Sequence, residues 1–182
     1  MKNMKNQMLG KFSVHETIAR GTFSVVRHCI DVTTNNKYAL RVIDRQKIEE
    51  LGLLENLKNE ITIMKMFSHP SVVCVVNMMA STNRIFLVLD VMNDGNMKKK
   101  IFAEQYINEE EALYFFHQFF SGLEYLHSMG VTHGNLKLEN ILLHDDGCLK
   151  ITDFRYNVCC FAFFFSYLCF CDLFSLFCLP SL

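Results

Sequence analysis

The sequence has no excess of charge of either sign. Its 182 residues include 18 lysines and arginines and 19 aspartates and glutamates, which gives a formal net charge of -1. A nearly neutral chain has no strong field to attract nucleic acid, so nucleic-acid binding is not expected. The N-terminus, MKNMKNQMLGKF, has no apolar run after its positive charges and is unlike a secretory signal. We therefore expect the folded part to be cytoplasmic.

The eight cysteines do not have the spacing of a metal site. Cys29, Cys74 and Cys148 stand alone in apolar or turn contexts, which is typical of reduced thiols. The others lie between Cys159 and Cys178 with no histidine among them and no two-residue spacing between pairs. A structural zinc site is therefore not expected.

Charge almost disappears at the C-terminal end. From Arg155 onward only Arg155 and Asp172 are charged, and phenylalanine and cysteine dominate. The stretch 158–180 is long enough for a membrane helix, but a carboxylate within it would cost roughly 2.5–3.5 kcal/mol. Translated non-coding sequence is the favoured explanation of residues 155–182, and a membrane anchor is the alternative.

The first part of the chain has the periodicities of an α+β fold. Runs rich in valine, isoleucine and aromatic residues, separated by turn residues, predict five antiparallel strands at residues 12–18, 23–30, 37–43, 72–79 and 85–92. Apolar residues at three- and four-residue steps predict one helix over 46–67, which ends before His69-Pro70.

A second helix is predicted from Asn108 to Gly130. Asn108 and Glu111 have the spacing of a capping box, and glycine is typical of a helix end. Between them runs one wide apolar stripe, made of Ala112, Phe115, Phe116, Phe119, Phe120, Leu123 and Leu126. If it is not fully covered, this helix face is a candidate surface for a protein partner. A small hairpin is predicted after it, around the turn at 144–147.

Three segments, in this order, resemble the motifs of eukaryotic Ser/Thr protein kinases: IARGTFSVV, NEITIMKMFSHPSVV and FFSGLEYLHSMGVTHGNLKLEN. The sequences of these segments are most similar to those of plant calcineurin-B-like-interacting protein kinases. The resemblance implies an N-terminal extension at 1–11, a kinase-like N-lobe and hinge at 12–92, and the first part of a helical C-lobe at 93–154. It also implies ATP and magnesium as cofactors.

By this resemblance, the nucleotide would be bound by Ile18, Gly21, Val26, Ala39, Arg41, Glu60, Asp90, Met92 and Leu142. Only the middle glycine of the family's glycine-rich loop, Gly21, is kept. Arg41 stands where the family has a lysine that pairs with the phosphates and with a helix glutamate, here Glu60. An arginine keeps the charge, but its planar fork is longer and wider than an ammonium group. The resemblance therefore predicts that the ion pair survives and that the phosphate geometry does not.

The stretch HGNLKLEN, residues 133–140, resembles the catalytic loop, but Asn135 occupies the position of the family's catalytic aspartate. Loss of a general base typically slows a reaction by about 10²- to 10⁴-fold. Lys137 is implied as a phosphate contact, and Asn140 and Asp153 as the magnesium ligands. The family's Asp-Phe-Gly is here Asp-Phe-Arg, with Arg155 in the place of glycine.

Three functions are compatible with these residues. The first is a truncated, kinase-like protein, a pseudokinase with weak or no phosphotransfer; no activation segment or Ala-Pro-Glu motif follows Phe154. The second is an active Ser/Thr kinase fragment that needs a partner chain. The third is a non-catalytic module that binds a protein through the apolar helix face or a membrane through the tail.

Overall fold

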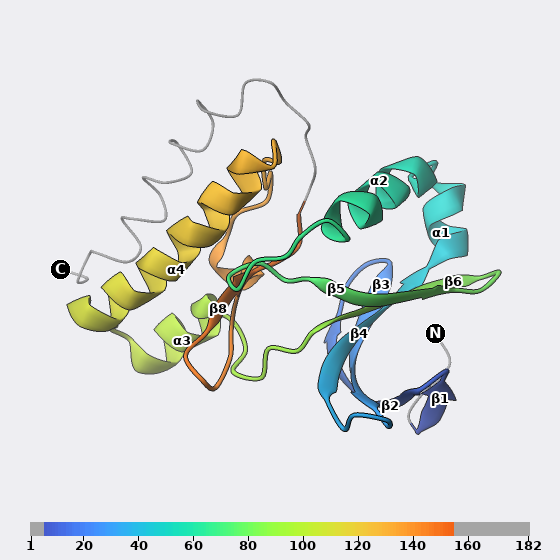
Figure 1. Cartoon of the computed structure of the whole chain (residues 1–182), viewed down its shortest axis with the longest axis horizontal. Helices are drawn as coiled ribbons and strands as arrows, with labels where there is room; N and C mark the ends of the chain where they lie inside the picture. Colours follow the sequence, from blue (N-terminus) through green and yellow to red (C-terminus); the bar gives the residue numbers. More distant parts are fainter. Residues whose placement is uncertain (1–5, 155–182) are drawn as a thin grey trace. The chain divides into compact units, whose positions relative to one another are not determined.

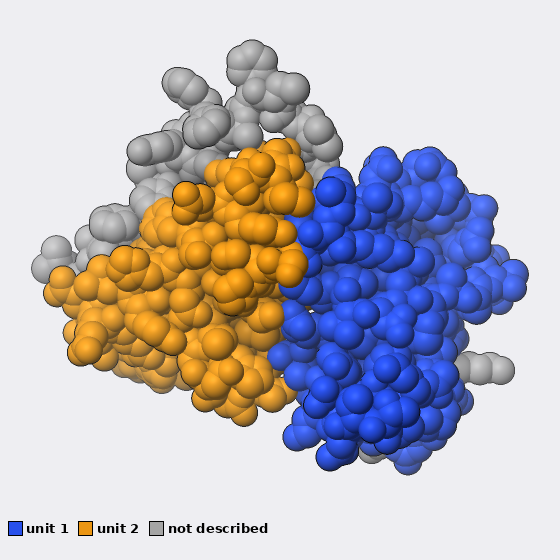
Figure 2. All heavy atoms as spheres, in the orientation of Figure 1, with its two compact units in different colours: residues 1–67, 74–91 blue, residues 68–73, 92–182 orange. Residues whose placement is uncertain are grey.

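The computed structural model describes residues 6–154 and divides the chain into two compact units (Figure 2). Unit 1 is Met1–Phe67 with Cys74–Val91, and unit 2 is Ser68–Val73 with Met92–Leu182. The predictions made for residues 155–182, including the membrane anchor, lie outside the described residues. Within 6–154, no helix combines the length and hydropathy that crossing a bilayer requires.

Unit 1 is built on a curled antiparallel sheet (Figure 1). Its order is β1-β2-β3-β4-β6-β5, with β1 at Gln7–Leu9, β2 at Phe12–Arg20, β3 at Ser24–Asp31, β4 at Lys37–Asp44, β5 at Val75–Ala80 and β6 at Arg84–Asp90. The five predicted strands are all present, and the α+β fold is confirmed. The sixth, β1, lies in the predicted N-terminal extension and pairs with β2 through Leu9 and Phe12.

Alternating side chains place the core of unit 1 on one face of the sheet. In β3 every second residue is buried, from Val25 to Asp31, as expected for a strand with one covered face. The buried cluster on this face consists of Phe12, Val14, Cys29, Leu40, Val42, Phe86 and Val88. Ala39 and Arg41 alternate with Leu40 and Val42 along β4, so they point to the other face.

The predicted helix over 46–67 is in fact two helices, α1 at Arg45–Glu50 and α2 at Leu54–Met64. Gly52 lies between them with a φ of +68°. Its N–H donates to Glu49 O at 3.0 Å, and the Leu53 N–H donates to Ile48 O at 3.0 Å. These are the two bonds of a Schellman motif, which ends a helix and favours glycine at the left-handed position. The break was missed because the apolar spacing continues across it.

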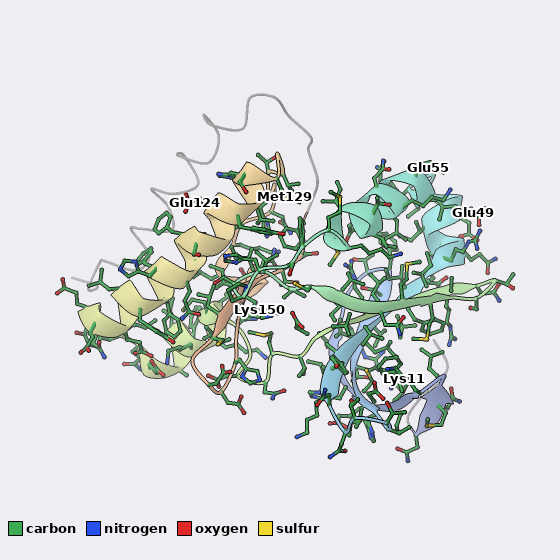
Figure 3. All side chains as sticks on the ribbon, viewed as in Figure 1. Lys11, Glu49, Glu55, Glu124, Met129 and Lys150 are labelled. Atoms are coloured by element: carbon green, nitrogen blue, oxygen red, sulfur yellow. The ribbon has the colours of Figure 1, made fainter. Side chains whose placement is uncertain are left out.

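The buried carboxylate of Asp31 accepts several hydrogen bonds at the end of strand β3. Asp31 binds Lys11 Nζ at 2.7 Å, and its other oxygen accepts the Thr33 hydroxyl at 2.6 Å and the Thr33 N–H at 2.9 Å. The hydrogen bond from Lys11, followed by the hydroxyl of Thr33, lowers the pKa of Asp31 to about 2. Lys11, labelled in Figure 3, is half exposed, whereas the Asp31 side chain is buried.

Asp31 is therefore expected to make unit 1 acid-sensitive. Because its pKa is lower in the folded state, its stabilising effect is complete above the unfolded pKa of about 3.9 and is lost as the pH falls toward 2. The difference in melting temperature between wild type and Asp31→Asn should thus be large at pH 6 and shrink between pH 4 and pH 2. Thermal melts at matched pH measure it. A difference that stays constant over this range would contradict the assignment.

Up to residue 154, where the description of the chain ends, unit 2 contains two helices, a 3₁₀ turn and a short hairpin. They are α3 at Met97–Glu104, α4 at Glu109–Ser128, the 3₁₀ turn at Leu138–Asn140, β7 at Ile141–Leu143 and β8 at Leu149–Ile151. The predicted cap is confirmed, because Asn108 Oδ1 accepts the Glu111 N–H at 2.9 Å. The predicted end is confirmed too, since Gly130 has a φ of +71° and the Val131 N–H donates to Leu126 O at 3.0 Å.

The apolar stripe of α4 is narrower in the structure than the sequence predicts. Phe115, Phe119, Leu123 and Leu126 are buried. Of the remaining predicted members, Phe120 is exposed and the others are half-buried. The helix thus packs along a single line of side chains, and β8 is among its contacts. The partner surface on this helix stays a prediction.

Candidate nucleotide and phosphotransfer site

The β2–β3 hairpin carries the predicted glycine-rich loop. Ala19 pairs with Val26 and lies within β2, and the Gly21 N–H donates to Ser24 O at 2.8 Å. Ala19 takes the place of the first glycine of the family's loop, and because it has strand conformation this position does not require a glycine. Ile18 is exposed on the same strand, and Val26 is half-buried.

Arg41 and Glu60 form the ion pair that the sequence predicts. Arg41 Nη1 lies 3.0 Å from Glu60 Oε1, and their side chains are 23% and 19% exposed. Strand β4 holds Arg41 between Val26 on β3 and Leu87 on β6, and it places the buried Ala39 opposite Leu89. This pair joins helix α2 to the centre of the sheet within unit 1.

The predicted hinge begins at Asp90, whose side chain has a structural task. Its Oδ2 accepts the Cys74 N–H at 3.1 Å, and the Asp90 N–H donates to Cys74 O at 3.4 Å. Asp90 therefore ties the end of β6 to the start of β5. Met92, in unit 2, is half-buried. The hydrogen bonds of this segment to an adenine ring stay a prediction.

In unit 2, His133 fixes the loop that contains Asn135. It is 2% exposed, and its Nδ1 accepts the Asn135 N–H at 3.2 Å, so the proton of the neutral ring lies on Nε2. That nitrogen donates to Thr152 O at 2.9 Å. Burial lowers the pKa of His133 to about 4, so the ring is neutral at physiological pH. Its ring also packs against Phe154, with centroids 4.8 Å apart.

Asn135, Asn140 and Asp153 form one hydrogen-bonded network. Asn135 Nδ2 donates to Asp153 Oδ2 at 2.8 Å and lies 3.4 Å from the main-chain oxygen of Asp153. Asn140 Nδ2 donates to the Asn135 carbonyl at 2.8 Å, and the Thr152 N–H donates to the Asn140 carbonyl at 3.0 Å. The chain thus brings together the three polar residues predicted for base and metal binding.

Comparison with known proteins identifies the family. The model of the protein kinase domain matches residues 12–157. This chain belongs to the protein kinase family. Kinases from plants are among its relatives: CBL-interacting protein kinase 11 of Oryza sativa subsp. japonica is 35% identical over 154 residues, which are 85% of this chain and 31% of that protein.

Two Arabidopsis thaliana kinases are similarly related. CBL-interacting serine/threonine-protein kinase 9 is 36% identical and CBL-interacting serine/threonine-protein kinase 8 is 38% identical, each over 146 residues that make up 80% of this chain and 33% of the relative. The resemblance to calcineurin-B-like-interacting kinases is confirmed. The chain spans about a third of the length of these relatives.

The two residues predicted as magnesium ligands, Asn140 and Asp153, have donor groups that suit magnesium. Asn140 uses its amide nitrogen for the Asn135 carbonyl, so its Oδ1 is the atom left for a cation. Asp153 offers a carboxylate whose Oδ1 is not used by Asn135. Mg²⁺ is typically held by one or two carboxylates together with substrate phosphates, and these oxygens fit that donor set.

Two predicted residues lie around this network. Lys137 is exposed just before the 3₁₀ turn, and its carbonyl accepts the Asn140 N–H at 2.9 Å. Leu142 is half-buried on β7, opposite Lys150 of β8. The roles of Lys137 as a phosphate contact and of Leu142 as an adenine contact stay predictions.

Proposed function

We propose that this chain is a kinase-like protein that binds an adenine nucleotide and transfers phosphate to protein hydroxyls weakly or not at all. One observation carries the second half of the proposal. The side chain in the position of the catalytic base, Asn135, is a hydrogen-bond donor to Asp153. A kinase needs an acceptor there to take the substrate proton. Even with its amide turned around, Asn135 would offer only a neutral oxygen, which is a far weaker base than a carboxylate.

The size of the loss follows from general-base catalysis. Removing such a group typically slows a reaction by about 10²- to 10⁴-fold, which is roughly 3–5 kcal/mol of barrier. Arg41 adds to the loss. Its guanidinium keeps a positive charge beside the sheet, but it directs a planar fork where the family has a compact ammonium group.

The first half of the proposal, nucleotide binding, is supported by parts that are intact. Gly21 closes a tight hairpin, Arg41 is held by Glu60, and Asn140 and Asp153 present oxygen atoms in one network. When bound, magnesium would supply positive charge that neutralises the phosphates. In unit 2, Asn140 and Asp153 would hold the cation and Lys137 would contact a phosphate. In unit 1, Arg41 would offer a positive charge to the nucleotide.

The purified 182-residue chain is expected to bind a fluorescent ATP analogue saturably and to transfer no γ-phosphate to a serine or threonine peptide above the blank. Equilibrium titration and a radiolabel transfer assay measure the two parts. Asp153→Asn, which removes the carboxylate ligand, is the blank for transfer. Magnesium-dependent peptide phosphorylation by the wild type, absent from this variant, would overturn the impairment. Absence of saturable binding with or without magnesium would overturn the nucleotide site.

A further inference from the structure

We propose that Asn135 is a positioning residue that makes nucleotide binding by this chain largely independent of a divalent cation. The inference rests on the proposed nucleotide site, and it assigns to Asn135 a task other than failed base catalysis. Its amide holds the Asp153 carboxylate at 2.8 Å and also approaches the Asp153 main-chain oxygen at 3.4 Å. One oxygen of the carboxylate that the family uses to bind metal, Asp153 Oδ2, is therefore already engaged by the protein.

The electrostatic argument compares asparagine with the family's aspartate. Two carboxylates at this separation repel each other, and each disfavours the ionised form of the other. A divalent cation between them removes that repulsion, so the family's arrangement favours cation binding. With Asn135 the repulsion is absent, and an N–H dipole compensates part of the charge of Asp153. A cation therefore gains less by binding here, and a cation that contacts Asp153 Oδ2 must compete with an existing hydrogen bond.

Hydrogen bonds within the protein hold the backbone that leads into Asp153. Asp153 has a φ of +62°, a left-handed conformation that is uncommon for residues other than glycine. Such a conformation persists where the surroundings fix it. Here the preceding residue, Thr152, is bonded through its N–H to Asn140 and through its carbonyl to His133. These bonds, together with the one from Asn135 Nδ2 to Asp153 Oδ2, fix the segment that presents the Asp153 carboxylate.

The charge that faces the phosphates is smaller for the same reason. The family's residues would present two carboxylates at positions 135 and 153 to a polyphosphate, whereas this chain presents one. Binding of a metal-free, highly charged nucleotide is correspondingly less opposed. Metal and nucleotide binding are linked, and typical couplings between two ligands change affinity by about 5- to 150-fold. Asn135 is expected to bring the coupling in this chain below that range.

The test compares nucleotide affinity in magnesium with affinity in EDTA for the full chain. A fluorescent ATP analogue is titrated into wild type, Asn135→Asp and Asn83→Asp. The last is a matched control, because Asn83 lies exposed in the β5–β6 turn. The ratio of the dissociation constant in EDTA to that in magnesium should be at most about threefold for wild type and Asn83→Asp. It should be at least about tenfold for Asn135→Asp.

A further variant separates the hydrogen bond from the charge. Asn135→Ala removes the amide without adding a carboxylate, and its ratio should lie between those of wild type and Asn135→Asp. Thermal melts show that each variant is folded. Equal ratios for wild type and Asn135→Asp, with nucleotide bound by both, would overturn the inference and leave the proposed function standing.

A titration without nucleotide decides the inference even if the proposed nucleotide site fails. Free Mn²⁺, followed by its paramagnetic resonance signal, is added to the nucleotide-free chain. Asn135→Asp should bind Mn²⁺ at least about tenfold more tightly than wild type, because two adjacent carboxylates attract a cation more strongly than one. Equal Mn²⁺ affinity in the two proteins would overturn the inference, whatever the nucleotide result.

Discussion

The Asn135→Asp variant is expected to turn over ATP on the order of a hundredfold faster than the wild-type chain, or more. The substitution supplies a carboxylate at the end of the loop that His133 holds in place, and it adds a second negative group beside Asp153 to attract magnesium. Release of labelled phosphate to a serine peptide and to water measures the gain. Arg41 stays unchanged in this variant, so the rate should remain below that of an intact kinase site.

Two controls show whether the gain comes from the intended chemistry. Adding Asp153→Asn to Asn135→Asp removes the metal ligand and should return the rate to the wild-type value. Asn83→Asp makes the same chemical change on the surface of unit 1 and should leave the rate unaltered. A rate for Asn135→Asp within about threefold of wild type would show that the asparagine is not the limiting defect, since base catalysis is worth far more.

The sequence predicts the sheet well because each central strand carries its own signal. Strand β3 alternates buried and half-buried residues along its whole length, as a period of two requires. Two of the elements that were missed have no such signal. Strand β1 is only three residues long, and it exists because the chain turns at Gly10 to pair with β2. Helix α3 contains three consecutive lysines, which interrupt the apolar periodicity that would predict a helix.

Contacts in the site differ in how far they can be predicted. The pair between Arg41 and Glu60 follows from motif spacing, and the structure contains it. The hydrogen bond from Asn135 to Asp153 does not follow from motif spacing. It joins side chains of two loops, so it depends on the backbone conformation of both loops. Gly134 and Asp153 both have left-handed φ values, 67° and 62°, and this backbone conformation sets the directions of the Asn135 and Asp153 side chains. The structural bond of Asp90 to Cys74 was likewise missed.

The packing of α4 depends on a residue that sequence patterns alone do not single out. Gly122 is buried in the middle of the helix, and a Cβ built on it would lie 2.8 Å from the Ser71 carbonyl oxygen and 3.1 Å from Ile151 Cδ1. That carbonyl cannot easily move, because it accepts the Ile151 N–H at 2.9 Å. The Ser71 N–H is also held, by His69 Nδ1 at 3.1 Å. Only a glycine lets α4 approach the 68–73 segment and β8 this closely.

Gly122→Ala is therefore expected to destabilise the protein, although alanine in a helix normally stabilises by about 1 kcal/mol relative to glycine. Overpacking a rigid contact typically costs about 1–3 kcal/mol, and here the clash is with backbone, so the upper part of that range applies. The net loss should be about 1–2 kcal/mol in the free energy of unfolding, measured by urea denaturation.

The sign of the change separates packing from helix propensity. Glu124→Ala, on the exposed side of the same helix and labelled in Figure 3, also introduces alanine but meets no backbone, so it should change stability by less than about 0.5 kcal/mol. If Gly122→Ala proved as stable as wild type or more so, the close approach of α4 to Ser71 would be wrong. The loop of Asn135 would be affected too, since β8 leads directly to Thr152 and Asp153. A packing defect at Gly122 should therefore weaken nucleotide binding as well as folding, whereas Glu124→Ala should leave both unchanged.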